Sequence, residues 1–263
     1  MEAHTAQQTC SRRVARVLMR NALQPASAAN TLHTFYSTLY KTYGPQHWWP
    51  ARTRLEMIVG AYLTQATAWT SVERSIANLR RAGCLGLAGL RGTTERDLQS
   101  LIRPSGFVQR KAASLLAFVS FLDAEHGSSL DRLRRQNPKQ TRQQLLALPS
   151  VGAETADAIL VYALGHPAIV VDEYLRRIAR RHGLLRAHGQ QEDFALRSAA
   201  EVMLQTRVQA TALADAQEFH ALVVAVGKRH CKAAAQCSGC PLEEFLPRVQ
   251  ADNPRKRRQS SGN

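Results

Sequence analysis

Apolar residues recur every three or four positions along almost the whole chain, as they do on one face of an α-helix. Residues 55–63 and 115–122 show this spacing most clearly, and the alternation typical of half-buried strands is nearly absent. Glycines and prolines divide the pattern into about ten segments of ordinary helix length with short connections. The sequence therefore predicts an all-α fold, and helices of this kind can form two lobes with a cleft between them.

One apolar run departs from the helical pattern. Residues 168–171 (Ala-Ile-Val-Val) are too few for a helix and lead directly into a helical segment at 174–181. A β-strand is the alternative for such a run. Because the run is short and the next helix follows at once, we expect an extended, buried connector.

The chain is strongly basic. It has 263 residues, with 35 Lys and Arg against 20 Asp and Glu, a net charge of +15 and a pI of about 10.4. This charge favours an anionic partner such as nucleic acid. A hydrophobic share of 44% is ordinary for a globular protein and excludes wholesale disorder. The longest apolar runs, 156–164 and 221–226, are too short to cross a membrane, so we expect no membrane contact.

Both ends of the chain are basic. Residues 1–30 hold several arginines without the apolar core of a secretory signal, and we interpret them as a basic extension, with a transit peptide as the alternative. Residues 248–263 predict a disordered basic tail. Five cysteines are too few for a disulfide-built secreted domain. We therefore expect a cytoplasmic protein, associated with the bacterial nucleoid if it binds DNA.

A tight turn between two helices is the first segment with functional meaning. Thr141 is expected to cap a helix that runs to Leu148, Leu148–Gly152 makes the turn, and a second helix begins at Ala153 and ends at Leu164. Backbone amides at such a helix start can bind a DNA phosphate. An ordinary helix-to-helix turn is the alternative.

Asp172 follows the apolar run 168–171 and precedes Tyr174, Arg176 and Arg177. A carboxylate at the end of a buried segment and beside arginines is typical of a tuned functional group. A helix N-cap is the alternative, and the two roles can coexist.

The stretch 148–184, LPSVGAETADAILVYALGHPAIVVDEYLRRIARRHGL, resembles the helix-hairpin-helix and the following aspartate loop of one enzyme family. This is the endonuclease III branch of the helix-hairpin-helix-GPD DNA glycosylases. The resemblance extends over roughly residues 30–247, through 62–67, 106–112, 227–231 and 240–242. It implies a two-lobed helical glycosylase fold, and double-stranded DNA with a damaged base as the partner of a monomer.

The resemblance assigns roles residue by residue. Asp172 matches the catalytic aspartate. Gln65 matches a glutamine that fills the gap left by the extruded nucleotide, and Phe107 matches an apolar wedge. The DNA contacts implied by the matching segments are Gln65, Phe107, Lys111, Leu148, Pro149, Ser150, Val151, Gly152, Ala153 and Thr155. A helix-surface residue for Gln65 and a core aromatic for Phe107 are the alternatives.

Glu154 departs from the pattern. Bifunctional endonuclease III enzymes have a lysine at this position, which attacks C1′ of the sugar, and a carboxylate cannot form that imine. We therefore expect a monofunctional glycosylase. Together with 67–70 and 154–160, this makes the chain most similar to the 3-methyladenine glycosylase relatives of endonuclease III. An alkylated purine is a good leaving group, and Trp69 is a candidate to stack on it, although a packed structural tryptophan is equally consistent.

Three cysteines near the C-terminus, Cys231, Cys237 and Cys240, resemble part of an iron–sulfur motif. Family members with a [4Fe-4S] cluster use C-x6-C-x2-C-x5-C, whereas this chain has Cys231-x5-Cys237-x2-Cys240, with Leu246 where the fourth cysteine belongs. A cluster completed by water, His230 or Cys10 and a degenerate loop without a cluster both remain open, and a zinc site lacks the same ligand.

From the sequence we expect residues 31–50 and 169–247 to form one helical lobe, and 51–168 a six-helix lobe with the hairpin. The expected activity is hydrolysis of the N-glycosidic bond of a damaged base, an alkylated purine in our reading. The alternatives are removal of uracil, thymine opposite guanine or an oxidised base, acid–base work by Glu154, and a DNA-binding module without catalysis.

Overall fold

The computed structural model describes residues 25–48, 51–184, 190–205 and 211–247. These residues form α-helices joined by short 3-10 and π turns, and within them there is no β-strand, only an isolated bridge between Cys231 and Ala235. The prediction of an all-α fold is confirmed. Most of the predicted N-terminal extension, the C-terminal tail and Cys10 lie outside the described ranges. No helix in the described part of the chain is long and apolar enough to cross a membrane.

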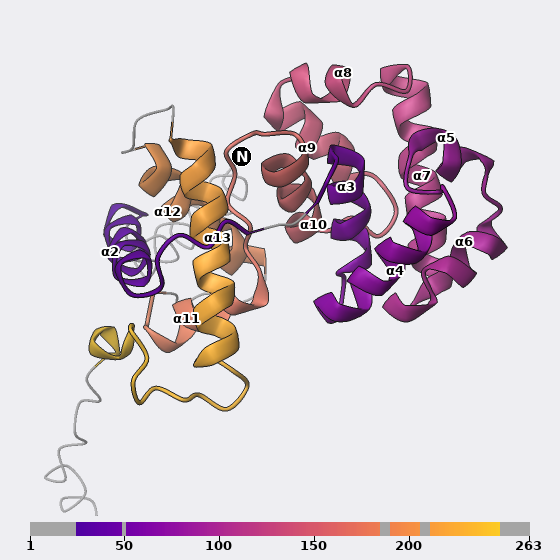
Figure 1. Cartoon of the computed structure of the whole chain (residues 1–263). Helices are drawn as coiled ribbons and strands as arrows, with labels where there is room; N and C mark the ends of the chain where they lie inside the picture. Colours follow the sequence, from indigo (N-terminus) through magenta and orange to yellow (C-terminus); the bar gives the residue numbers. More distant parts are fainter. Residues whose placement is uncertain (1–24, 49–50, 185–189, 206–210, 248–263) are drawn as a thin grey trace, which may run out of the picture.

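Helices α3 to α10 gather around one hydrophobic core, which we call the first lobe (Figure 1). They are α3 (Arg54–Leu63), α4 (Trp69–Arg81), α5 (Leu87–Gly92), α6 (Glu95–Leu101), α7 (Val108–His126), α8 (Leu130–Arg135), α9 (Pro138–Leu146) and α10 (Ala153–Ala158). Tyr62 and Phe118 are among the largest side chains buried there. Residues 51–168 thus hold eight α-helices rather than the expected six, because short connections separate brief helices such as α5 and α8.

The second lobe consists of α2 (Pro25–Tyr43), α11 (Glu173–Arg181), α12 (Gln190–Gln205), α13 (Ala212–Arg229) and the turn η3 (Glu243–Phe245). Figure 1 shows α2 beside α12 and α13, although α2 precedes the whole first lobe in the sequence. Helix α2 begins at Pro25, and Ala28 and Ala29 are buried in this second core. Residues 25–30, which we expected in the extension, therefore belong to this lobe.

The predicted hairpin is present with different helix boundaries. Helix α9 is capped by Asn137, whose side chain accepts a hydrogen bond from the amide of Lys139, and Pro138 occupies the first turn. Thr141 is buried inside the helix, so the expectation that it caps the helix is wrong. After the turn, α10 passes into the π-helical segment η2 (Ile159–Ala163), which ends before Leu164.

The run 168–171 is neither helix nor strand, and its residues 169–171 are buried, so a buried connector is present as expected. It joins the two lobes and ends at Asp172, the residue before α11. A third small hydrophobic cluster holds Tyr162 and Val170, with Trp48 and Leu213 packed against it. Both lobes contribute to this cluster, which lies next to the cavity described below.

Candidate active site

A cavity of about 280 Å³ lies where the two lobes meet. Its lining comes from the loop between α3 and α4, from α10, from the connector and from α13. Among the lining residues are four that the sequence singled out, Gln65, Trp69, Glu154 and Asp172. Residues that are distant in the sequence therefore share one open cavity, large enough to take part of a nucleotide.

Asp172 is buried, with 6% of its surface exposed, and has two geometric tasks. Its Oδ1 accepts a hydrogen bond of 2.7 Å from the amide of Leu175, which caps α11. Its Oδ2 lies 3.6 Å from Nε2 of His220. The carboxylate is therefore fixed at a helix N-terminus while it lines the cavity, so the N-cap role is present and does not exclude a catalytic one.

His220 lies next to Asp172, and Tyr162 lies next to His220. Neither residue was identified from the sequence. Nδ1 of His220 is 2.8 Å from the hydroxyl of Tyr162, which also lies 3.2 Å from the carbonyl oxygen of Gln217. Both side chains are buried, and burial followed by the charge of Asp172 raises the pKa of Tyr162 above its ordinary value. A histidine within the apolar helix α13 was the available signal, but nothing local related it to Asp172.

Glu154 lies at the mouth of the cavity, with its side chain 56% exposed. Its Oε2 is 4.0 Å from Nη1 of Arg176, and Arg176 also pairs with Asp193 at 2.6 Å. The surrounding protein and, next, the charge of Asp172 raise the pKa of Glu154, while Arg176 opposes this shift. Two carboxylates thus share the cavity, which is typical of sites that use acid–base or charge stabilisation.

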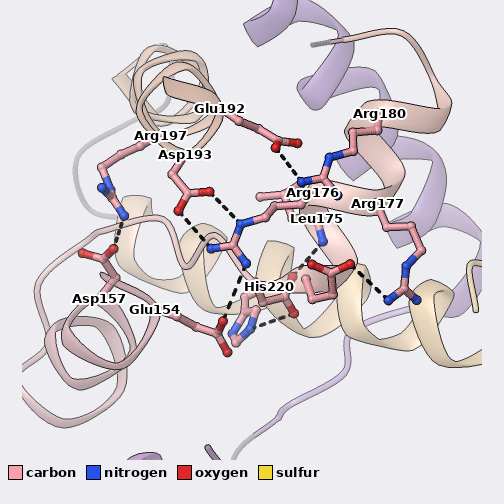
Figure 2. A network of polar contacts seen from close by, with 12 residues as sticks. Glu154, Asp157, Leu175, Arg176, Arg177, Arg180, Glu192, Asp193, Arg197 and His220 are labelled. Atoms are coloured by element: carbon pink, nitrogen blue, oxygen red, sulfur yellow. Dashed lines mark hydrogen bonds and ion pairs between the residues drawn. The ribbon is translucent and has the colours of Figure 1, made fainter. Parts of the chain in front are cut away.

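A network of charged residues joins the two lobes beside Glu154 (Figure 2). Asp157 of α10 is 1% exposed and pairs with Arg142 of α9 at 2.7 Å and with Arg197 of α12. On its other side, Arg176 connects Glu154 to Asp193. Removing one partner from a buried pair leaves an uncompensated charge. These contacts therefore stabilise the packing of α10 against α9 and α12.

The hairpin presents its turn to solvent. Pro149, Ser150 and Gly152 are exposed, and Ser150 has a positive φ of 61°, whereas Val151 is buried in the first core. Leu148 and Ala153 are half-buried, and Thr155 is buried. No side chain caps the start of α10. The first amides of that helix are therefore not covered by a cap and are available to an anion.

Gln65 connects the hairpin to the loop after α3. Its Nε2 donates to the carbonyl oxygen of Ser150 at 3.0 Å and to Oγ1 of Thr155 at 3.1 Å. The side chain is half-buried and lines the cavity. Gln65 is thus not a plain surface residue, because it is held at the edge of the cavity against the predicted phosphate-binding turn.

Two tryptophans line the cavity. Trp69, at the start of α4, is half-buried and donates from Nε1 to Glu73 at 2.8 Å. Trp48 was not identified from the sequence, and its ring lies edge-on to Tyr162 and to His220. Tyr174 lines the same cavity and packs tightly on Gly227 of α13, where a Cβ would collide with its ring. Three aromatic side chains and two carboxylates thus line one cavity.

Phe107 and Lys111 have opposite environments. Phe107 is 61% exposed and has a positive φ of 48°, so it is not a core aromatic. Lys111 is 1% exposed and its ammonium group donates to three protein acceptors. The expectation that Lys111 contacts DNA is therefore wrong, because its charge does not reach the surface. Burial, followed by the charge of Arg110, lowers the pKa of Lys111 to about 8.

The three C-terminal cysteines border a small cavity of about 20 Å³ that Leu246 also lines. Sγ of Cys231 accepts a hydrogen bond of 3.0 Å from Arg181, and His230 faces the carbonyl oxygen of Gln236 at 3.1 Å. Among the residues that the structure describes, no group of three or more His, Cys, Asp or Glu is placed to hold a metal ion. Among the described residues, no fourth cysteine lines this small cavity beside the three.

The chain is similar in sequence to known proteins. The profile of the HhH-GPD superfamily base excision DNA repair proteins matches residues 59–203. A Methanocaldococcus jannaschii protein assigned as a DNA repair glycosylase is 35% identical over 215 residues, which cover 81% of this chain and 94% of that protein. Endonuclease III of Bacillus subtilis is 29% identical over 147 residues, 56% of this chain and 59% of that enzyme.

Two solved structures are similar in fold. The 3-methyladenine DNA glycosylase of H. pylori, bound to 1,N6-ethenoadenine, has a TM-score of 0.64 and 26% identity, and the match covers 77% of this chain and 97% of that one. A trapped endonuclease III–DNA covalent intermediate has a TM-score of 0.67 and 21% identity, covering 83% and 95%. The resemblance seen in the sequence motifs is thus confirmed, and the chain belongs to the HhH-GPD superfamily of base excision DNA repair proteins.

Proposed function

We propose that this DNA glycosylase family member removes alkylated purines by hydrolysis and leaves an intact abasic site. The observation that carries the proposal is Asp172, a buried carboxylate that caps α11 and lines a cavity together with two tryptophans. Glu154 stands at the position where a lyase would have its lysine. The proposed enzyme acts as a monomer on double-stranded DNA in the cytoplasm.

The proposed reaction starts with extrusion of the damaged nucleotide into the cavity. The bond between C1′ and the base nitrogen breaks, and the electron pair leaves with the base. Asp172 stabilises the positive charge that develops on the sugar and accepts a proton from the water that attacks C1′. The hydrogen bond from Leu175 and the imidazole of His220 hold the carboxylate in position, so His220 is a positioning residue in this scheme.

The cavity favours a cationic base for two reasons. Trp48 and Trp69 offer ring faces and edges for stacking, and an electron-rich ring attracts a positively charged base. Glu154 and Asp172 add negative charge in the same space. A cationic purine is also a good leaving group, so one carboxylate suffices without a strong acid. The similarity to a 3-methyladenine glycosylase bound to an alkylated adenine supports this substrate class.

The proposed lack of a lyase step rests on Glu154, which stands at the position where bifunctional relatives have their lysine. A Schiff base needs a free amine beside C1′, and Glu154 cannot supply one. The ammonium of Lys111 is buried and engaged by three acceptors. Lys228 is the one lysine that lines the cavity in the described part of the chain, and it is exposed on α13. We propose that Lys228 contacts DNA and forms no covalent bond with the sugar.

DNA binding is proposed to use mainly the first lobe. The amides at the start of α10 bind a phosphate, Gln65 fills the gap in the stack, and Phe107 enters as the wedge. A basic surface of this kind predicts affinity that falls steeply with salt concentration.

A base-release assay tests the substrate class. Full-length protein is mixed in excess with duplexes that contain 3-methyladenine, 7-methylguanine, 1,N6-ethenoadenine, uracil, thymine opposite guanine or 8-oxoguanine, and the free base is quantified. We expect release of alkylated purines alone. Release of uracil, thymine or 8-oxoguanine at comparable rates would contradict the substrate assignment, and tight binding without release of any base would favour a non-catalytic module.

A further inference from the structure

Lys111, the fourth residue of α7, is 1% exposed. Its Nζ donates to the carbonyl oxygen of Leu63 at 2.8 Å, to Oγ1 of Thr67 at 2.7 Å and to the carbonyl oxygen of Ser105 at 2.7 Å. An ammonium group has three N–H donors, so all of them are used. No ion pair joins Lys111 to a carboxylate within the described ranges. Its partners are two backbone carbonyl oxygens and one hydroxyl group, all of them neutral.

The three acceptors lie in two segments that are distant in the sequence. Leu63 and Thr67 flank the loop that contains Gln65, and Ser105 precedes the turn that contains Phe107. The two loops also touch directly, because Oγ1 of Thr67 lies 2.7 Å from the carbonyl oxygen of Ser105. One buried cation thus connects the two segments that carry the proposed DNA-inserting side chains.

Both loops contain a residue in the left-handed region of backbone space. Ala66, next to Gln65, has a φ of 49°, and Phe107 itself has a φ of 48°. Residues with a side chain rarely adopt this conformation unless their surroundings enforce it. The ammonium group also lies 5.9 Å from the centre of the Phe107 ring. The buried lysine is therefore placed to enforce both unusual turns.

We infer that Lys111 is a positioning residue that sets the spacing between Gln65 and Phe107, so that both enter the DNA stack together when the damaged nucleotide is extruded. Lys111 has this role only if those two residues enter DNA as proposed above. Two groups that fill one gap must be held at a fixed separation, and a separation fixed before binding reduces the cost of ordering the loops on DNA.

The experiment compares two DNA substrates with the same alkylated purine. In one the lesion is fully paired, and in the other it lies in a one-nucleotide bulge, where extrusion is easier and leaves no partner base behind. Single-turnover excision is measured for wild type, Lys111→Met and the milder Thr67→Val. The latter keeps the lysine but removes one of its acceptors and the direct hydrogen bond from Thr67 to Ser105. Lys41→Met, at an exposed lysine of α2, controls for the loss of one positive charge.

We expect Lys111→Met to slow excision from the paired duplex by roughly tenfold, the size typical of coupling between contacting residues, while excision from the bulge changes by less than about twofold. Thr67→Val should lower the duplex-to-bulge rate ratio in the same direction, and Lys41→Met should leave that ratio unchanged. Phe107→Ala should add little to Lys111→Met in the duplex, because both changes remove the same insertion step.

Equal losses on both substrates for Lys111→Met and Thr67→Val would overturn the inference, because they would indicate a general folding role. An unchanged duplex rate in Thr67→Val together with a folded, fully active Lys111→Met would also overturn it. Phe107→Ala and Gln65→Ala in the wild-type background separate the two proposals. If neither changes the duplex-to-bulge ratio, the insertion step itself is wrong, whatever Lys111 does.

Discussion

Replacement of Asp172 by asparagine should separate its two tasks. The asparagine side chain keeps an oxygen that can accept the hydrogen bond from the amide of Leu175, which Asp172 now accepts at 2.7 Å. Asparagine and aspartate are about equally good N-cap residues. The variant loses the negative charge that faces the cavity and lies 3.6 Å from Nε2 of His220.

The magnitudes follow from this geometry. Loss of a charge that stabilises the sugar cation and accepts a proton should reduce the single-turnover rate by about 10³-fold, or about 4 kcal/mol. The free energy of unfolding should change by less than about 1 kcal/mol, because the cap remains and only its charge at the helix N-terminus is lost. Asp172→Ala should show a similar rate loss and cost about 1 kcal/mol more in stability.

The assay measures base release from an alkylated duplex, DNA affinity and thermal unfolding for the same three proteins. We expect Asp172→Asn to bind DNA as tightly as wild type or more tightly, since it removes a negative charge. A variant that keeps more than about a tenth of the wild-type rate would refute catalysis by Asp172, because a reacting carboxylate contributes at least about 10²-fold. Loss of binding together with excision would show a structural role.

Three further predictions concern groups around Asp172. Because its pKa is raised, Glu154 takes up a proton at a higher pH than an ordinary glutamate. We therefore expect kcat/KM for a cationic base to fall as the pH drops through that pKa. Glu154→Gln should remove this part of the pH–rate profile. His220→Leu should slow excision by about tenfold or more, and His220→Gln, which keeps an N–H donor, by less, measured at saturating DNA. Trp48→Ala should weaken binding of lesion-containing DNA by about tenfold while binding of undamaged DNA is unchanged in a filter or anisotropy assay.

Local patterns were sufficient for most of the fold. Helical periodicity and the glycine and proline positions located the hairpin, and the shortness of the run 168–171 indicated the connector that leads to Asp172. The N-terminus of α9 was misplaced because Asn137 and Pro138 form a stronger start than Thr141, which is buried inside the helix. Several neighbouring residues can cap the same helix, and the sequence alone does not show which of them does so.

The residues that sequence reasoning missed are those placed by tertiary packing. Trp48 and His220 reach the cavity because they pack on Tyr162, which is far from both in the sequence. Lys111 was expected to contact DNA because it lies in a segment, 106–112, that resembles the family. Its burial depends on three acceptors from two segments that are distant in the sequence. No local sequence pattern predicts that these acceptors lie close together in the fold.

The central claim is hydrolysis at Asp172 without a covalent intermediate. The most direct measurement mixes the full-length protein with a duplex that contains an alkylated purine, in parallel with and without borohydride, and then with and without alkali. We predict base release, strand breaks only after alkali, and no protein–DNA adduct after borohydride reduction. A trapped adduct, abolished by Lys228→Gln, would contradict the claim and would identify Lys228 as an amine that attacks the sugar.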